Sequence, residues 1–416
     1  MHKKNNFKDA PLSEEFKRDL NNVLHNRIKP KQIGDDWEKQ LDKITYYDFL
    51  VNNLGVSEDV LYNYIDPYFA SAAYGVSGDA ISAYGAYKLQ MPGTLGHLSK
   101  EKRDTFINRD FYAFPGGNST MLRHFVKALI PEAIQGDQLI SNVGYAPVNF
   151  DELDRPGNQF RIRLGATAIN VKHEQSSGNP ERVVVTYTKN GKSYRVKAKA
   201  IVMSTGGWIT RRVVTDMPQP IVDAYQQFNH TPMLTVSVAL TNWKFMEKLG
   251  ISAARWFNNY SWYANIRRPM IVDGHSMPLD PSLPALMSLY VPFVQYAGNP
   301  LSVQASLGRT ELFSKSYRDY ETEIRNQLVT MFGDYGFDPK RDIAGIVLNR
   351  WGHAYIAPQP GFYFGSDGHP SPPEVVDEGY GRIAFGHSEI TGFQAWSNGY
   401  VQGRRAVEKI LRYAVA

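Results

Sequence analysis

The segment from Gly381 to Leu411 constrains the fold of this chain more than any other part of the sequence. A short apolar run, Ile383–Phe385, leads into the polar turn 386–388, and a helical pattern begins near Ala395. This order is typical of a strand that ends at the edge of a parallel sheet and continues into a helix. The N–H groups of the first helical turn then point back at the strand end, which favours an anion or an electron-rich ring there. An ordinary strand-turn-helix exit from an α/β sheet is the alternative.

Two glycines in this helical pattern, Gly399 and Gly403, favour the first interpretation. A glycine lets another group approach the backbone closely, because it has no Cβ. In a helix interior each glycine costs about 1 kcal/mol relative to alanine. A purely structural helix would rarely contain both.

The composition excludes several classes of protein. With 416 residues and 43% apolar side chains, the chain can fill one large composite domain or two interleaved ones. A net charge of +5, with basic residues spread among acidic ones, argues against nucleic-acid binding. No apolar run approaches the roughly 20 residues of a membrane span, and no apolar signal-peptide region follows Met1–Lys8. The absence of cysteine excludes disulfides and thiol catalysis, and it leaves a cytoplasmic, periplasmic or peripheral membrane location open.

The first half of the chain is predicted to contain helices, followed along the sequence by strands. Apolar periodicity predicts helices over residues 1–105, and we expect Ser119 to cap a helix that runs to Ile130. Two strands, Phe160–Leu164 and Ala168–Lys172, are predicted before a hairpin over residues 183–197. The Asn-Gly pair in the middle of that hairpin is a strong signal for a type I′ turn.

The second half predicts a buried strand and then a second sheet. The continuous apolar run Ala200–Met203 is typical of a buried parallel strand. Strand patterns at Thr235–Leu240 and Ala285–Val291 predict another sheet, and Gly308–Phe332 predicts one long amphipathic helix.

These patterns predict a mixed α/β fold in which a substrate domain of antiparallel sheet and helices is interleaved with a Rossmann-like cofactor domain. The expected parts are the helical residues 1–105, the cofactor-domain residues 106–215 with the hairpin, the substrate-domain residues 216–345 and the C-terminal cofactor part 346–416.

Four segments together resemble the flavin-containing amine oxidoreductase superfamily. They are Phe114–Gly117, Asp342–Gly345, the Asn-Arg-Trp-Gly-His-Ala-Tyr of Asn349–Tyr355, and Gly381–Leu411, and they look most like the branch that contains bacterial spermidine dehydrogenase. The resemblance implies an FAD-dependent oxidoreductase that oxidises an amine, such as the polyamine spermidine, by hydride transfer to the flavin, with an imine and then an aldehyde as product. It does not imply the electron acceptor.

The resemblance also implies which residues meet FAD. The expected contacts are Ala168 near adenine, Thr205, Gly206 and Gly207 at the end of the buried strand, Gly386, His387, Ser388 and Glu389 near ribose and pyrophosphate, and Ala395, Trp396 and Ser397 near the flavin pyrimidine.

For the amine, we expect a wall of Trp351, His353 and Tyr355, because these side chains alternate toward one face if Arg350–Ile356 is extended. Aromatic faces attract ammonium groups by roughly 0.5 to 2 kcal/mol each. His353 is hypothesised to be a general base; the alternative is a core histidine. A long diamine also needs a remote carboxylate, for which Glu389, Asp367 and Asp66 are the candidates.

One unit of the superfamily's pattern is not found in these residues. Such proteins carry a strand, Gly-x-Gly-x-x-Gly and a helix, with an acid about 20 residues further on for the ribose. The clusters Gly75–Gly78 and Gly116–Gly117 lack both the preceding apolar strand and the acid. Since that unit brings backbone and helix dipole to the pyrophosphate, we expect this chain alone to bind FAD weakly or not at all. Three explanations stay open: the sequence is a fragment or one part of a split gene, a second chain supplies the segment, or the cofactor is no longer bound.

Other chemistries find less support. The ten histidines show no metal-ligand spacing, and no Gly-x-Ser-x-Gly motif is present for a serine hydrolase. Two further interpretations stay open: a non-catalytic partner subunit that keeps the fold, and an NAD(P)-linked oxidoreductase.

Overall fold

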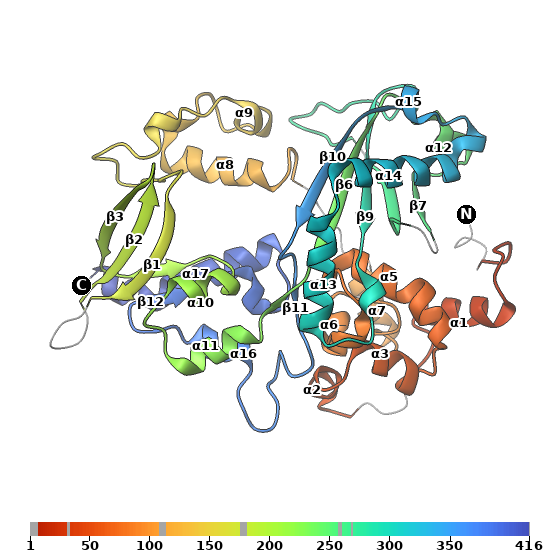
Figure 1. Ribbon diagram of the computed structural model, residues 1–416, viewed down its shortest axis with the longest axis horizontal. Helices are drawn as coiled ribbons and strands as arrows, with labels where there is room; N and C mark the ends of the chain where they lie inside the picture. Colours follow the sequence, from red (N-terminus) through yellow and green to blue (C-terminus); the bar gives the residue numbers. More distant parts are fainter. Residues whose placement is uncertain are drawn as a thin grey trace.

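The computed structural model describes residues 7–30, 34–107, 114–174, 181–256, 260–267 and 269–415. Helices and strands are mixed along the chain (Figure 1). Their buried side chains form three main hydrophobic cores. We call these the helical core, the sheet core and the parallel-sheet core. The mixed α/β class predicted from the sequence is confirmed.

The helical core is built by the N-terminal part of the chain, as predicted. Its largest fully buried side chains include Tyr46, Phe69 and Tyr74, so part of the tyrosine-rich sequence forms core. The helices are α1 (Glu14–Leu24), α2 (Trp37–Asp42), α3 (Tyr46–Asp48), α4 (Glu58–Val60), α5 (Asp66–Phe69), α6 (Ala83–Lys88) and α7 (Lys100–Ile107), with π-helical turns at Phe49–Asn53, Leu61–Ile65 and Ala70–Tyr74.

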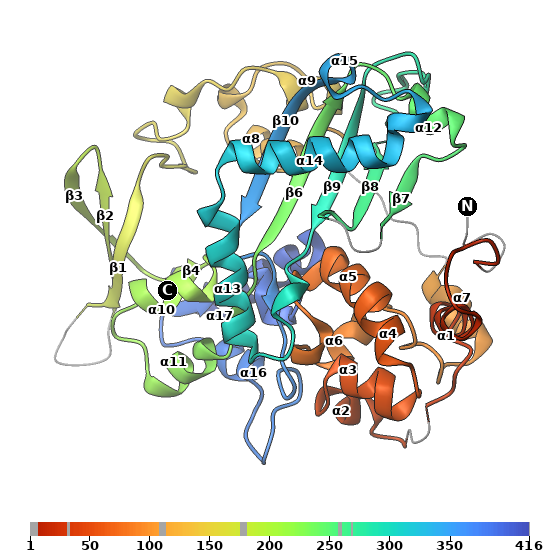
Figure 2. The same cartoon turned by 45° about the vertical axis from the view of Figure 1, so that its right-hand side comes forward.

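The sheet core lies under a five-stranded antiparallel sheet with the strand order β10-β6-β9-β8-β7. The strands are β6 (Met233–Leu240), β7 (Ala253–Arg255), β8 (Tyr263–Ile266), β9 (Ala285–Val291) and β10 (Ile343–Trp351), and two predicted strands, β6 and β9, lie at its centre. Apolar side chains of β6 and β9 alternate onto one face, which α14 (Tyr317–Phe332) covers (Figure 2). The short helices α12 (Lys244–Lys248) and α15 (Pro339–Asp342) lie at the end of this sheet.

The prediction of one helix over Gly308–Phe332 is wrong. Two helices, α13 (Leu301–Ser314) and α14, meet at Lys315 and Ser316. Lys315 has an extended backbone, and the hydroxyl of Ser316 accepts a hydrogen bond from the N–H of Asp319 while the Asp319 carboxylate accepts one from Ser316 N–H. This capping box starts a new helix within an otherwise continuous amphipathic pattern.

The parallel-sheet core lies beside two small sheets. The first is the antiparallel sheet of β1 (Thr167–His173), β2 (Val183–Lys189) and β3 (Lys192–Ala198), in which Asn190 and Gly191 both have positive φ, as a type I′ turn requires. The prediction of a strand over Phe160–Leu164 is wrong, since this segment is irregular.

The second small sheet is parallel and has two strands, β4 (Ile201–Met203) and β12 (Ile383–Phe385). The N–H of Ile201 donates to Arg382 O, and Gly386 N–H donates to Met203 O, so Val202 directs its backbone groups away from β12. The outer edge of β4 is thus unpaired within the described residues. Helices α10 (Gly207–Val213), α11 (Gln219–Gln226), α16 (Pro372–Asp377) and α17 (Trp396–Val415) surround this pair (Figure 1).

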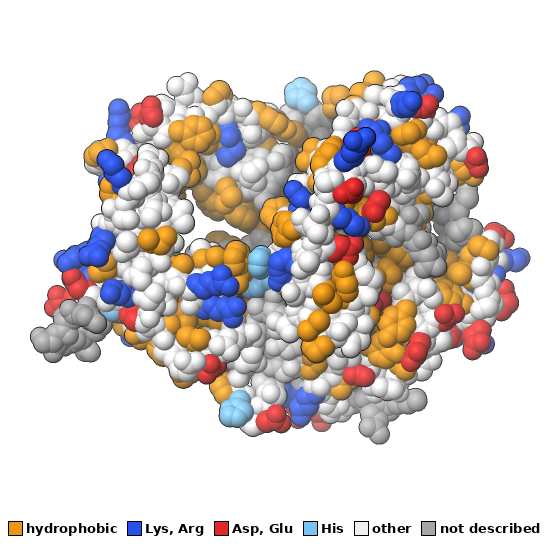
Figure 3. Space-filling view, viewed as in Figure 1, with side chains coloured by type: hydrophobic (Ala, Val, Ile, Leu, Met, Phe, Trp, Pro, Cys, Tyr) orange, Lys and Arg blue, Asp and Glu red, His pale blue; other side chains and the backbone are white. Residues whose placement is uncertain are grey.

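Helices α8 (Asn118–Leu129) and α9 (Ile140–Tyr145) form a separate arm above these elements (Figure 1). The expected cap by Ser119 is wrong, because α8 begins one residue earlier and Gly117, with a φ of 83°, stands at its N-cap. A space-filling view shows a hollow between this arm and the parallel pair (Figure 3). Over the described part of the chain, none of the helices combines the length and apolarity needed to cross a bilayer.

Candidate functional site

The turn after β12 packs tightly against α17. A Cβ at Gly386 would lie 2.9 Å from Val202 Cγ1 and 3.0 Å from Ala406 Cβ, so only glycine fits without a shift. His387 follows as the N-cap of a 3₁₀ turn (Ser388–Thr391), and its Nδ1 accepts a hydrogen bond from Glu389 N–H at 3.3 Å. The sequence therefore places Gly386, His387 and Ser388 at the strand end, as expected.

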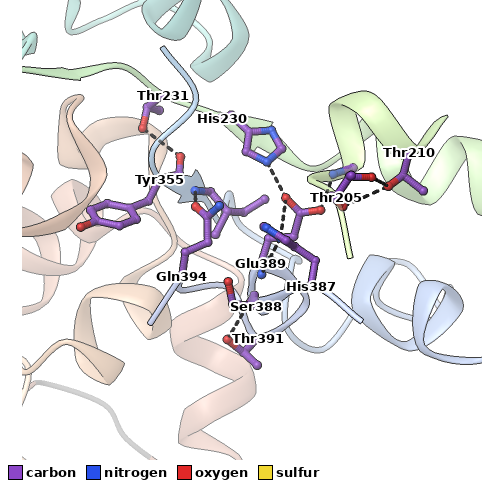
Figure 4. Close-up of polar contacts among 12 residues, drawn as sticks. Thr205, Thr210, His230, Thr231, Tyr355, His387, Ser388, Glu389, Thr391 and Gln394 are labelled. Carbon is purple, nitrogen blue, oxygen red and sulfur yellow. Dashed lines mark hydrogen bonds and ion pairs between the residues drawn. The ribbon is translucent and has the colours of Figure 1, made fainter. Parts of the chain in front are cut away.

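Glu389 is fully buried and turned toward the start of α10 (Figure 4). Its carboxylate accepts hydrogen bonds from Gly207 N–H at 2.5 Å and from His230 Nε2 at 2.6 Å, and His387 Nδ1 lies 3.4 Å away. Burial by itself raises the pKa of Glu389, but the hydrogen bond from His230, together with the nearby His387 side chain, outweighs burial and holds this pKa below its usual value. Glu389 is a buried anion that joins three segments, and its carboxylate accepts hydrogen bonds from Gly207 and His230 rather than from a described N–H group of α17.

The strand end predicted at Thr205, Gly206 and Gly207 is the start of α10. A Cβ at Gly207 would lie 2.4 Å from the Tyr225 ring and 3.0 Å from Glu389 Oε1, which explains the glycine. The Thr205 and Thr210 hydroxyls are 2.8 Å apart (Figure 4). These contacts fix the β4–α10 turn against Glu389.

A pocket of about 380 Å³ opens at the N-terminus of α17. Three of the predicted flavin contacts, Ser388, Ala395 and Trp396, line it. The rest of its lining is Phe125, Gln394, Gly399 and Tyr400. Gln394 is held by a hydrogen bond from Ile356 N–H to its Oε1 at 2.6 Å, and the Phe125 ring stacks on Trp396 with centroids 6.0 Å apart. Ser397 lies in the same first turn, whose N–H groups have no acceptor within the helix.

Gly399 and Gly403 lie on α17 with little around them. A Cβ at Gly399 would have only Ser388 Cβ near it, at 3.9 Å, and a Cβ at Gly403 would meet no described atom within 4 Å. The protein's own packing therefore does not require either glycine, in contrast to Gly386.

The expectation that Arg350–Ile356 is extended is wrong. β10 ends at Trp351, a turn follows, and β11 (Ile356–Ala357) pairs separately with β5 (Asn229–His230). The three predicted side chains consequently have different surroundings: His353 stacks on Trp208 with centroids 4.0 Å apart, Tyr355 packs on Phe393 at 5.5 Å, and Trp351 is 54% exposed. They form no single wall.

The electrostatic surroundings of His353 are positive. Burial, together with the nearby Arg309, His230 and Arg212 side chains, lowers the pKa of His353 to about 4. The imidazole is therefore neutral at pH 7 and is a weaker base than an ordinary histidine. The Arg309 guanidinium donates to the carbonyl oxygen of His230 at 3.3 and 3.4 Å. Figure 3 shows Lys or Arg side chains over the α10 region, with a His side chain beside them.

The remaining predicted residues lie apart from this cluster. Ala168 is exposed on β1, paired with Tyr187 next to a register shift. Asp66 is buried in the helical core and accepts a hydrogen bond from Gly78 N–H at 2.6 Å, and Asp367 lies exposed in a loop. The described residues hold no group of three His, Asp or Glu side chains suited to a metal ion.

Sequence reasoning missed three residues of the site: His230, Trp208 and Arg309. Each comes from a different segment, and each meets the site through a partner more than 75 residues away in sequence, such as Glu389 for His230 and His353 for Trp208. No local pattern marks them, although Trp208 follows the Gly-Gly pair directly.

No protein-family model matches the chain, and no curated protein matches it. Among solved structures, it is similar to wild-type putrescine oxidase bound to putrescine, with a TM-score of 0.58, 15% identity, and coverage of 97% of this chain and 77% of that chain. A triple mutant from the redesign of cofactor binding in putrescine oxidase gives a TM-score of 0.59 at 14% identity over the same shares. A fatty acid isomerase from P. acnes that produces CLA gives 0.52 at 11%, covering 96% and 76%. At these identities the likeness shows the fold.

Proposed function

We propose that this chain forms the larger part of a flavoenzyme that binds FAD and oxidises an amine to an imine, which water converts to an aldehyde. The observation that carries the proposal is the pocket at the start of α17, where Ser388, Ala395 and Trp396 meet. The fold shared with putrescine oxidase, which has been described bound to putrescine, supports the same chemistry. The branch of spermidine dehydrogenase, and a polyamine as substrate, belong to this proposal and rest on the sequence resemblance.

The residues present fit the flavin end of FAD. The backbone at Gly399 has almost no atoms around it, and the first-turn N–H groups near Trp396 and Ser397 have no acceptor within the helix. Both features suit an electron-rich pyrimidine ring. Gly386 and Ser388 would meet the ribose and pyrophosphate, with Thr205, Gly206 and Gly207 behind them and Ala168 toward adenine. Because the Glu389 carboxylate already accepts hydrogen bonds from Gly207 and His230, we assign the ribose contact to Ser388 or His387.

When bound, FAD supplies the oxidation by accepting a hydride from the carbon next to the amine. The chain's own residues position the amine and hold it unprotonated. His353 is neutral at pH 7, so it can accept a hydrogen bond from an amine N–H, and Arg309 and Arg212 disfavour a second positive charge nearby. Trp351 and Tyr355 would provide apolar contact from the end of β10 and from the loop that follows.

A further strand along the open edge of β4 is part of the proposal. The backbone of Val202 points outward there, and a βαβ unit with Gly-x-Gly-x-x-Gly would place its strand on such an edge and its helix N-terminus at the pyrophosphate. A second polypeptide is one source of this unit. We therefore expect FAD to bind this chain alone weakly.

The test is an FAD titration followed by quenching of flavin fluorescence, which measures even weak binding. We compare the chain with Gly399→Val, which narrows the pocket, and with Arg412→Val, which changes α17 far from it. Binding that Gly399→Val abolishes and Arg412→Val preserves supports the proposal, and amine-dependent bleaching of bound flavin is then the assay for oxidation. No quenching with any variant would remove the support for flavin binding by this chain alone and would favour either a requirement for the missing βαβ unit or a non-catalytic partner subunit. Stabilisation by NAD(P) without flavin would favour a nicotinamide-linked enzyme.

A further inference from the structure

A second pocket, of about 320 Å³, lies where the end of β9 meets α13 and the π-helical turn Leu61–Ile65. The described residues that line it all differ from those of the pocket at α17 and from those that we assign to FAD and to amine oxidation. A pocket of this size is at the small end of the range of ligand sites, roughly 300 to 1,000 Å³, so it suits a small ligand. The lining residues are Tyr62, Asn63, Pro67, Tyr260, Trp262, Val291, Pro292, Phe293, Val294, Gln295, Glu311 and Lys315.

Aromatic rings form much of the wall of this pocket. Tyr62, Tyr260 and Trp262 all line it, and Tyr62 is 41% exposed, so a ligand can reach its ring. The protein's own Lys315 ammonium lies 5.2 Å from the centroid of the Tyr260 ring. Aromatic faces attract ammonium groups. The wall is therefore suited to an organic cation.

Glu311 places a carboxylate at the same pocket. Gln295 Nε2 and Tyr296 OH donate to its Oε2, and Lys315 Nζ lies 3.2 Å from its Oε1. An ionised carboxylate has about four acceptor positions, so these three donors leave a place for one more. The Glu311 side chain is 23% exposed. Lys315 also lies 3.4 Å from Glu323, so the carboxylates outnumber the ammonium here.

The electrostatic potential at the pocket is negative despite Lys315. Burial raises the pKa of Tyr260, and the nearby Tyr320, Glu323 and Glu311 side chains raise it as well. Burial and the hydrogen bond to Glu311 likewise raise the pKa of Tyr296. Surroundings that disfavour a negative charge on these phenols favour a positive charge on a ligand.

We propose that this pocket binds the ammonium group of a small alkyl amine. The ammonium donates a hydrogen bond to Glu311 and lies against Tyr62 and Tyr260, while the alkyl chain packs on Trp262 and Phe293. Binding here needs no flavin, so this inference does not rest on the proposed function. Because the substrate proposed there is also an amine, the pocket is a second place on the chain for the same class of ligand.

Helix α13 connects this pocket to the candidate site. Glu311 lines the pocket, and Arg309, two residues earlier on α13, donates to the carbonyl oxygen of His230. The two sites thus share one helix, while a ligand in the pocket contacts a different set of side chains.

The test compares three four-carbon ligands by calorimetric titration of the full chain without FAD. Butylamine is an ammonium ion at pH 7, butanol is uncharged and butyrate is an anion. We expect butylamine to bind, butanol to bind at least about tenfold more weakly, and butyrate not to bind.

Three variants of the pocket should change the affinity for butylamine in different directions. Glu311→Gln should weaken binding by about tenfold or more, because it replaces a charge-assisted hydrogen bond by a neutral one. Tyr62→Leu should weaken it by about threefold or more, because it removes an aromatic face. Lys315→Met should strengthen it by about threefold or more, because it removes the ammonium that competes for Glu311 and repels the ligand. A general loss of structure would weaken binding in all three.

Three control variants should leave the affinity for butylamine unchanged. Glu321→Gln removes a carboxylate on α14 that pairs with Arg325 and does not line the pocket. His353→Asn and Gly399→Val change the candidate site instead. Thermal unfolding of every variant shows whether it is folded.

The outcomes separate this inference from the proposed function. If butylamine binds with these changes in affinity and FAD does not bind, the pocket is confirmed and the flavin proposal loses its support. If Glu311→Gln and Tyr62→Leu change nothing while His353→Asn abolishes binding, the amine binds at the candidate site, which overturns this inference and supports the proposed function. The inference is also overturned if butanol or butyrate binds as tightly as butylamine, if Lys315→Met weakens binding, or if none of the ligands binds.

Discussion

At the scale of single residues, Glu389 has the largest role in joining distant segments. Its carboxylate connects β5, the start of α10 and the turn after β12 through Gly207, His230 and His387. A buried carboxylate without these partners would be unfavourable. This explains why an acid stands at a position from which the resemblance had implied a contact to ribose.

We predict that Glu389→Ala lowers the free energy of unfolding by about 3 kcal/mol at pH 7, because it leaves His230 and Gly207 N–H without their acceptor. The folded-state pKa of Glu389 lies below its ordinary value of 4.5. Its stabilisation is therefore fully present above about pH 4.5 and is lost as the pH falls toward the folded-state pKa.

The measurement is urea unfolding of wild type and variant at pH 7 and pH 3, where the difference between them should shrink at the lower pH. Glu408→Ala, which removes an exposed partner of Arg404 on α17, is the control and should change little at either pH. If wild type and Glu389→Ala differ by the same free energy of unfolding at both pH values, the negative charge assigned to Glu389 is wrong.

At the same scale, Gly386 and Gly403 are glycines for different reasons. Gly386→Ala should cost about 1 to 3 kcal/mol, because the added Cβ meets Val202 and Ala406 at 2.9 and 3.0 Å. Gly403→Ala meets nothing within 4 Å and should stabilise α17 by up to about 1 kcal/mol. Denaturant unfolding of both variants measures these changes in the free energy of unfolding. If both variants change it in the same direction, the packing described around one of the two glycines is wrong.

At the scale of elements, the parallel pair β4 and β12 is the least complete part of the molecule. β4 has three residues and one open edge, whereas β6 lies between β9 and β10. Two-stranded sheets are marginal without further packing, so the pair depends on α10, α17 and the parallel-sheet core.

Hydrogen exchange tests whether the open edge of β4 is less protected than the paired strand β6. We predict that the Val202 amide, which points to the open edge, exchanges much faster than the amides of Ile201 and Val236. A polypeptide that adds a strand to β4 would slow Val202 selectively. Equal protection of Val202 and Ile201 in the isolated chain would show that the edge is already paired.

At the scale of the whole molecule, the described residues form three main cores and a small fourth cluster around Ile130, Ala133 and Leu153, and the main cores differ in size. The helical and sheet cores contain more buried residues than the parallel-sheet core, which also has fully buried aromatic side chains but packs around two three-residue strands.

We therefore predict at least two thermal transitions in calorimetry, with the parallel-sheet core melting first. Fluorescence of Trp208 on α10 should change in the first transition and that of buried Trp262 in the second, each measured in a variant in which the other tryptophans are phenylalanine. FAD binding should move the first transition toward the second. A single transition whose calorimetric and van't Hoff enthalpies agree would contradict this.

The sequence by itself determined many of the elements and several candidate site residues. Alternation predicted β6 and β9, the Asn-Gly pair predicted the turn at Asn190 and Gly191, and the strand-turn-helix pattern placed Gly386, Ser388 and Trp396 at one end of the parallel pair. These are short-range properties, because side-chain periodicity and turn conformation depend on a few neighbouring residues.

Only the tertiary structure decided how distant segments meet. It gave Trp351, His353 and Tyr355 separate surroundings, and it brought Glu389 to His230. Strand pairing and burial bring together residues dozens to more than a hundred positions apart, and the energy of a buried charge depends on those partners rather than on its neighbours in the chain. Local sequence thus determines the elements, whereas their packing determines the charge of the candidate site.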